Sequence, residues 1–181
     1  TGQYQIYISE IENDGMGILY DKYLKLKKKL DLLGYFKKER KKKLPIFIQN
    51  IAIVTSKTGA ALQDILSIFK RHNFTGNIYV KDCRVQGSEC ENTIVNAISE
   101  LQDMNLDVIL LSRGGGSLED LWGFNEEEVI KSIYQSKIPI ISGVGHEVDY
   151  MLCDFVSDLR CSTPSVSAES IVDTNKEFLS K

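Results

Sequence analysis

Residues 107–120 read DVILLSRGGGSLED, and this stretch decides which class of fold the sequence predicts. Its first half is a short apolar run without alternation, which is typical of a strand buried on both faces. Three consecutive glycines follow, and they let the backbone turn sharply and approach a ligand closely. A buried strand that ends in such a turn is one unit of a parallel sheet covered on both sides.

The same unit recurs before and after this stretch. Short apolar runs alternate with segments whose apolar residues recur at helical spacing. The predicted strands are 50–55, 77–82, 107–112 and 138–144, and the predicted helices are 59–71, 90–104, 126–136 and 146–159. This alternation predicts an α/β fold with a mostly parallel sheet and helices on both faces. Asn125 and Glu128 have the spacing of an N-terminal cap for the third of these helices.

The chain before residue 45 has a different character. Residues 4–8 alternate as a strand does, and residues 20–33 carry apolar side chains at helical spacing. Residues 22–43 hold 11 of the 22 Lys and Arg but only two acids, a net +9 in a chain of −3. A solvated basic helix accounts for this excess, and so does a surface that guides a polyanion.

The overall composition sets further bounds. With 43% hydrophobic and 26% charged residues, the chain resembles an ordinary soluble globular protein. No apolar stretch approaches the roughly 18 residues that span a bilayer, and the first residues show no signal-peptide pattern. The four cysteines lack C-x-x-C or zinc spacing. We therefore expect free thiols and a cytoplasmic location.

The glycine turn is the first candidate for chemistry. Successive N–H groups of Gly114, Gly115, Gly116 and Ser117 can form a concavity that holds an anion. Arg113 adds a planar, permanently charged fork that matches phosphate oxygens. A plain strand-to-helix turn, with Arg113 in a salt bridge, would have the same sequence.

A second candidate follows the next predicted strand, where residues 143–149 read GVGHEVD. If His146 opens a helix, His146 and Asp149 lie on one face at i, i+3. An imidazole paired with a carboxylate is an acid/base unit that works near neutral pH. A capping aspartate beside a structural histidine is the alternative. The spacing differs from H-E-x-x-H, which argues against a zinc protease.

A third candidate is TSKTG at residues 55–59, between the first of these strands and its helix. The hydroxyls of Thr55, Ser56 and Thr58 at a helix N-terminus suit an anion, and Asp64 follows within the helix. Ordinary capping beside a solvated carboxylate explains the same residues. All three candidate loops follow strands, and we expect them to gather at one edge of the parallel sheet, where ligands bind.

These motifs, in this order and spacing, resemble the large-subunit family of exodeoxyribonuclease VII. The matching segments are IAIVTSKTGAALQDI, VQG, SRGGGSLEDLWGFNEEEV, IPIISGVGHEVDYMLCDFVSDLR and TPS. The resemblance implies three parts. Residues 1–44 would be the end of an OB-fold domain and a basic linker helix, and residues 45–172 the α/β nuclease domain. Residues 173–181 would begin a truncated C-terminal helical region.

The resemblance also implies an activity. Members of the family hydrolyse single-stranded DNA from either end to 5′-phosphorylated oligonucleotides, and they bind small subunits through the C-terminal region that is missing here. No metal is obligatory in many members, and Mg²⁺ is possible. The residues that correspond to the catalytic groups of the family are Asp64, Arg113, His146 and Asp149. Asp64 would be a second base or, with Asp149, a ligand of Mg²⁺.

Two other functions remain open at this point. A kinase-like domain would grip a nucleotide or sugar phosphate with glycine-rich turns, but the chain has no Walker-type sequence. A non-catalytic DNA-binding module is supported by the lysine run. Such a module would bind DNA without His146 and would cleave nothing.

Overall fold

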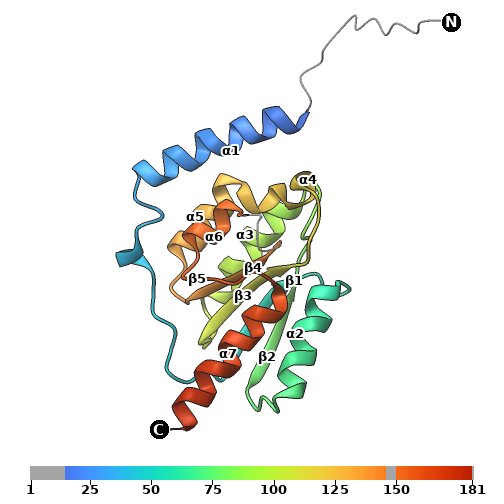
Figure 1. The fold of residues 1–181 in the computed structure, drawn as a ribbon, viewed down its shortest axis with the longest axis vertical. Helices are drawn as coiled ribbons and strands as arrows, with labels where there is room; N and C mark the ends of the chain where they lie inside the picture. Colours follow the sequence, from blue (N-terminus) through green and yellow to red (C-terminus); the bar gives the residue numbers. More distant parts are fainter. Residues whose placement is uncertain (1–14, 146–149, 181) are drawn as a thin grey trace, which may run out of the picture.

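The computed structural model of the chain describes residues 15–145 and 150–180 (Figure 1). Its centre is a five-stranded sheet in which all paired strands are parallel, in the order β2-β1-β3-β4-β5. The strands are β1 (Asn50–Thr55), β2 (Asn77–Asp82), β3 (Val108–Arg113), β4 (Ile140–Val144) and β5 (Leu159–Arg160). The predicted α/β class is confirmed, whereas the predicted strand at 4–8 lies outside the described residues.

Helices cover both faces of this sheet. They are α1 (Gly15–Leu32), α2 (Ala60–Arg71), α3 (Cys90–Leu101), α4 (Leu118–Leu121), α5 (Glu127–Gln135), α6 (Leu152–Val156) and α7 (Pro164–Leu179), with 3-10 turns η1 (Lys38–Arg40) and η2 (Trp122–Asn125). The helices α2 and α7 pack on one face, and α3, α5 and α6 pack on the other. The long helix α1 lies across the second group of helices (Figure 1).

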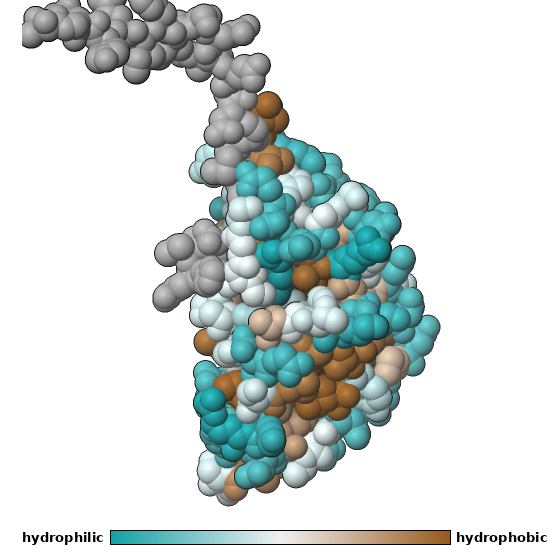
Figure 2. All heavy atoms as spheres, turned by 90° about the vertical axis from the view of Figure 1, so that its right-hand side faces the viewer, coloured by the Kyte–Doolittle hydropathy of each residue, from teal (hydrophilic) through white to brown (hydrophobic). Residues whose placement is uncertain are grey.

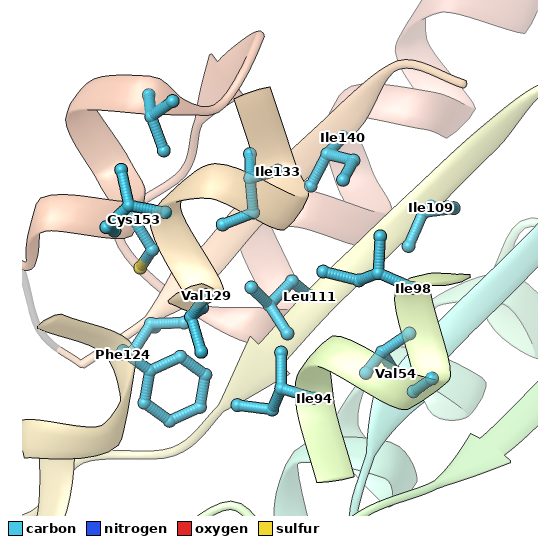
Figure 3. Close-up of a cluster of buried hydrophobic side chains, with 14 of the residues drawn as sticks. Val54, Ile94, Ile98, Ile109, Leu111, Phe124, Val129, Ile133, Ile140 and Cys153 are labelled. Atoms are coloured by element: carbon cyan, nitrogen blue, oxygen red, sulfur yellow. The ribbon is translucent and has the colours of Figure 1, made fainter. Parts of the chain in front are cut away.

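The core explains why the strands read as unbroken apolar runs. Successive residues of β3 enter opposite sides of the sheet: Ile109 and Leu111 pack toward α3 and α5, and Val108 and Leu110 pack toward α2 and α7. Figure 3 shows the apolar cluster on the α3 and α5 side of the sheet, in which Phe124 of η2 also packs. Each fully buried aliphatic side chain contributes about 1.5–3 kcal/mol. The four cysteines are free and buried, as expected.

The predicted helix at 146–159 is wrong on both sides of α6, because Tyr150 and Met151 precede the helix and Leu159 lies beyond it. The helix α6 ends at Val156, and Leu159–Arg160 form β5, which pairs with β4. The reason is the carboxylate of Asp158, which accepts the Ile140 N–H at 2.8 Å and so turns the chain into the sheet edge. The start of the helix α7 was not predicted, since the expected helical region began only at residue 173, although Thr163 caps α7 and Pro164 occupies its first position, which is a typical helix start.

Asn125 caps a different helix from the one that the sequence indicated. The cap of α5 is Glu126, and Asn125 is completely buried. Its Oδ1 accepts the N–H of Leu152 at 2.7 Å, at the first residue of α6. An amide that is 27 residues away in sequence therefore fixes the position at which α6 begins.

The basic segment is tied to the body of the domain by ion pairs. Lys22 pairs with Glu126 at 3.2 Å and Lys29 with Glu127 at 2.8 Å, so part of the positive charge anchors α1. Several other lysines are exposed and form no ion pair within the described ranges, namely Lys25, Lys28, Lys37, Lys38 and Lys43. The paired lysines therefore stabilise the fold, and the exposed lysines are the ones that a polyanion can bind.

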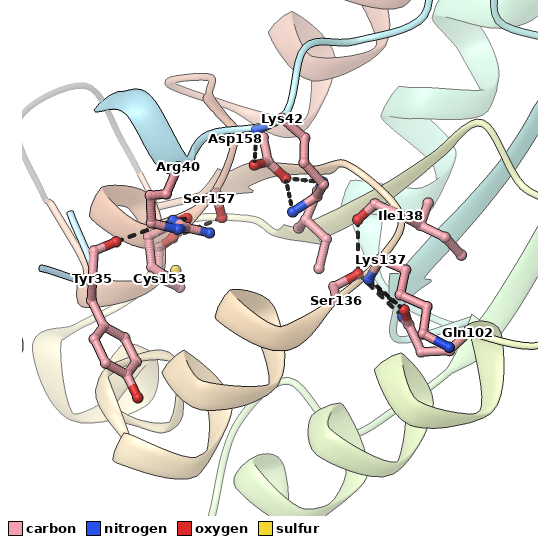
Figure 4. A network of polar contacts seen from close by, with 12 residues as sticks. Tyr35, Arg40, Lys42, Gln102, Ser136, Lys137, Ile138, Cys153, Ser157 and Asp158 are labelled. Carbon is pink, nitrogen blue, oxygen red and sulfur yellow. Dashed lines mark hydrogen bonds and ion pairs between the residues drawn. The ribbon is translucent and has the colours of Figure 1, made fainter. Parts of the chain in front are cut away.

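The strongest anchor of the basic segment is Asp158, whose side chain is 1% exposed. It accepts the backbone N–H of Lys42 at 2.7 Å and that of Ile140 at 2.8 Å, and it pairs with the Lys42 ammonium at 3.0 Å (Figure 4). One carboxylate therefore joins the linker to β4 at the edge where β5 is added.

We expect Asp158→Ala to lower the free energy of unfolding by about 3 kcal/mol, because it leaves two buried N–H groups without an acceptor. Lys42→Ala is the matched control. It removes only a partly exposed ammonium and should cost about 1 kcal/mol or less. Urea unfolding of both variants measures the difference. Equal losses would show that the ammonium, and not the two backbone donors, is what Asp158 stabilises.

The sheet ends at β2, which pairs only with β1 among the described strands. Figure 2 looks onto this side of the molecule, where apolar side chains reach the surface between polar ones. Tyr79 and Val80 are the large exposed apolar residues of β2. Lys81 beside them pairs with Glu100 of α3, which places a charge on the open edge.

Candidate active site

The strand order identifies the edge of the sheet at which a ligand fits. From β1 the chain passes to β2 on one side and then to β3 on the other, so the order reverses between β1 and β3. Ligands of such sheets bind at this reversal, beyond the carboxyl ends of the strands. The predicted loops follow β1, β3 and β4, which are neighbours, and they therefore begin at the same edge.

Arg113 is the last residue of β3 and is 7% exposed. Its Nη1 donates to the Gly114 carbonyl at 3.2 Å, and its Nη2 donates to Oε1 of Gln86 at 3.0 Å. Its nearest carboxylate among the described residues is Asp120, at 4.0 Å, and that side chain is 49% exposed. A buried guanidinium is costly unless an anion compensates its charge. Arg113 is thus a buried cation whose hydrogen-bond partners are neutral and whose ion pair with the half-exposed Asp120 is long.

Two glycines lie close to this arginine. A Cβ at Gly116 would collide with the guanidinium nitrogens of Arg113, so the fork lies directly against the glycine turn. Gly145 follows β4 with a φ of +77°, a conformation that favours glycine, and its N–H donates to the Arg113 carbonyl at 3.3 Å. His146 is covalently attached to this residue. The turn after β3 and the chain after β4 are therefore joined at Arg113.

The positive charge of Arg113 also affects a neighbouring thiol. Burial raises the pKa of Cys90 to about 11, and the nearby Arg113 opposes this rise. Cys90 begins α3, and its Sγ packs against Gly123. The thiol therefore stays protonated at neutral pH and leaves the charge of the guanidinium intact.

Not every predicted phosphate ligand in the glycine turn is free. The Ser117 hydroxyl accepts the Asp120 N–H, and the Asp120 carboxylate accepts the Ser117 N–H, both at 3.3 Å. Ser117 is thus occupied in a capping box at the start of α4. Gly114 and Gly115 lie before this cap and precede Gly116 in the turn.

The loop after β1 is organised by its own contacts. Thr55 is buried at the end of the strand, and the hydroxyls of Ser56 and Thr58 lie 3.2 Å apart. The N–H of Lys57 donates to Asp82 at 2.9 Å, and this bond is the main cause of the lowered pKa of that carboxyl. The loops after β1 and β2 are thereby held together.

A cleft of about 670 Å³ opens between these two loops. This volume lies within the range of roughly 300–1,000 Å³ that small-ligand sites occupy. Its lining comprises Ser56, Lys57, Thr58, Gly59, Asp82, Cys83, Arg84, Val85, Gln86 and Thr93. Hydroxyl, amide and cationic groups lie in this lining, and its two cations are paired with carboxylates, Lys57 with Asp82 and Arg84 with Glu89.

Of the four predicted catalytic residues, the structure describes the positions of two, Arg113 and Asp64. Arg113 stands at the expected edge. Asp64 is exposed in the second turn of α2, which packs on the opposite face of the sheet from the Arg113 side chain. His146 and Asp149 lie outside the described residues. Their described neighbours are Gly145, bonded to Arg113, and Tyr150, whose carbonyl accepts the Tyr23 hydroxyl at 3.0 Å.

Gln86 is the site residue that the sequence did not single out. It belongs to the segment VQG, which follows β2, and nothing in its local pattern indicates a partner. Its hydrogen bond to Arg113 spans 27 residues and appears only in the folded chain.

Within residues 15–145 and 150–180, no group of three or more His, Cys, Asp and Glu side chains is placed to hold a metal ion. In the same ranges, no helix combines the length and apolarity that crossing a bilayer requires.

Comparison with known proteins gives a consistent result. The family model described as exonuclease VII, large subunit, matches residues 35–181. An exodeoxyribonuclease 7 large subunit of Oceanobacillus iheyensis is 48% identical over 99% of this chain and 40% of its own length. Proteins of the same name from Nitratiruptor sp. and Clostridium tetani are 49% and 46% identical, over 43% and 46% of their lengths. The chain thus spans less than half the length of these relatives.

Proposed function

Because this chain belongs to the exonuclease VII large-subunit family, we propose that it carries a site that hydrolyses phosphodiester bonds of single-stranded DNA. The proposal covers release of 5′-phosphorylated oligonucleotides from either end and assembly with small subunits through a region outside this chain. It also places the protein in the cytoplasm.

One observation carries the proposal, namely the buried Arg113, whose hydrogen-bond partners are neutral and whose ion pair with Asp120 is long. The guanidinium is 8% exposed as a side chain, is held by a carbonyl and an amide, and has its nearest described carboxylate at 4.0 Å. A phosphate is the anion that its planar fork matches best. The location at the reversal of strand order supports the same assignment.

A division of roles follows from the chemistry of the residues. Arg113 and the N–H groups of the glycine turn hold the scissile phosphate and stabilise the charge that develops in the transition state. His146 moves a proton, to the leaving oxygen or from the attacking water. Asp149 orients the imidazole and favours its protonated form.

The remaining groups have less specific roles. Ser56 and Thr58 lie beside the cleft and contact the DNA backbone in this proposal, together with Thr55 at the strand end. Asp64, which lies in α2 on the other face of the sheet from the Arg113 side chain, would act as a second base only on DNA that also reaches α2. No metal is obligatory, and Asp64 and Asp149 are the carboxylates that would bind Mg²⁺.

The test is a cleavage assay with the full-length protein and its small subunit. We expect single-stranded DNA to be degraded to short 5′-phosphorylated fragments from both ends, and blunt duplex DNA of the same sequence to persist. Parallel reactions with Mg²⁺ and with EDTA measure the metal requirement. DNA binding without any cleavage would indicate a non-catalytic module, and binding of ATP in place of DNA would indicate a kinase-like site.

A further inference from the structure

Gln86 holds the arginine of the site through a hydrogen bond between side chains. Its Oε1 accepts Nη2 of Arg113 at 3.0 Å, and the second terminal nitrogen of the arginine is satisfied by the Gly114 carbonyl at 3.2 Å. Both ends of the planar fork are therefore fixed by acceptors. A guanidinium fixed in this way loses little freedom when it grips a phosphate.

The chemical nature of the acceptor is as informative as its position. Buried arginines are normally paired with carboxylates. Here the residue that occupies the pairing position is an amide, which orients the fork without cancelling its charge. The nearest described carboxylate is that of Asp120. Its Oδ2 lies 4.0 Å from Nη2 of Arg113 and also accepts the Ser117 N–H. The positive charge thus remains available to an incoming anion.

Gln86 also belongs to the wall of the 670 Å³ cleft. Because its carbonyl oxygen accepts from Arg113, its amide nitrogen keeps two N–H donors. Within the described ranges, Nε2 makes no hydrogen bond to the protein. The same side chain therefore joins the arginine to the cleft.

We infer that Gln86 is a positioning residue for Arg113, and that its neutrality preserves the charge with which Arg113 binds the DNA phosphate. This inference rests on the proposed function. It assigns a role to a residue outside the group Asp64, Arg113, His146 and Asp149.

The test compares two substitutions in the full-length protein with its small subunit. Gln86→Glu keeps the size and the acceptor oxygen but creates an ion pair with Arg113. Gln86→Ala removes the acceptor and leaves the charge. We expect Gln86→Ala to lower kcat/KM for single-stranded DNA on the order of tenfold, the effect of one lost bond to a charged group. Gln86→Glu should lose several-fold more than Gln86→Ala.

A second readout separates charge from packing. Neutralising one phosphate contact should reduce the slope of log K for single-stranded DNA against log salt by about 0.7. We expect this change in Gln86→Glu and not in Gln86→Ala. Gln135→Glu is the matched control, because it makes the same charge change at the exposed end of α5. It should cleave and bind as the wild type does.

A role in packing alone predicts the reverse order, with Gln86→Glu milder than Gln86→Ala and an unchanged salt slope. That order, or an equal loss in Gln135→Glu, overturns the inference. The proposed function fails in a different way, namely if Arg113→Ala still cleaves at the wild-type rate. If Arg113→Ala is inactive while both Gln86 variants match the wild type, only the role of Gln86 is wrong.

Discussion

Replacing Arg113 with lysine is expected to reduce the rate of single-stranded DNA cleavage by a factor on the order of 10² to 10³. Lysine keeps the charge but has a single nitrogen in place of the planar fork, so it cannot make the bidentate contact with a phosphate that two coplanar nitrogens allow. Affinity for DNA should fall much less, because many other backbone contacts and the charge itself remain. Single-turnover cleavage and equilibrium binding, measured on the same variant, separate the two effects.

The control for this substitution is Arg71→Lys, at the exposed end of α2. It makes the same chemical change away from the site and should leave cleavage unchanged. Thermal unfolding of both variants checks that the buried Arg113 position tolerates lysine. If Arg113→Lys is folded and cleaves within a few-fold of the wild type, Arg113 is not a bidentate phosphate clamp.

The second large effect concerns His146 and Asp149 as a coupled pair. If His146 transfers a proton, His146→Ala should lower the cleavage rate by a factor on the order of 10² to 10⁴. If Asp149 acts by orienting that imidazole, its removal should cost little more once His146 is gone, because the two act as one unit. Single-turnover rates of both single variants and the double variant measure the coupling.

The same series distinguishes orientation from metal binding. A ligand of Mg²⁺ should still matter in the His146→Ala background, and EDTA should reproduce the loss of Asp149. Each variant is therefore assayed with Mg²⁺ and with EDTA. If the losses in cleavage rate of the two single variants add up in the double variant, Asp149 does not act by orienting His146, and a metal-binding role is favoured. Near-normal cleavage by His146→Ala would rule out acid/base catalysis by that residue.

The sequence predicted the central sheet well because burial on both faces leaves a strong local pattern. The strands β1 and β2 were predicted at their observed bounds, and β3 within a residue. The strand β5 was missed because two residues carry no periodicity, and its pairing depends on Asp158, which is 18 residues beyond its partner Ile140. Long-range side-chain acceptors of this kind are invisible to a local reading.

The candidate site divides in the same way. The glycine turn and Arg113 were predicted as a phosphate site because the residues that suggest this chemistry are adjacent in the sequence. Gln86 was not, since its meaning lies in one contact across 27 residues. Asn125 was identified as a cap, but the helix that it caps is the one beginning at Leu152 and not its sequence neighbour. The local sequence thus indicated the capping role of Asn125, but its hydrogen-bond partner is known only from the folded chain.

The anchoring of the basic segment has a consequence for biosynthesis. The linker residue Lys42 is held by Asp158, which leaves the ribosome 116 residues later, and Lys22 is held by Glu126, which is 104 residues later. At roughly 5–20 residues per second, Lys42 waits about 6–23 seconds for its carboxylate. Throughout that interval like charges keep the nascent segment hydrated and extended. The linker therefore cannot attach to the sheet edge before Asp158 has been synthesised and β4 has formed.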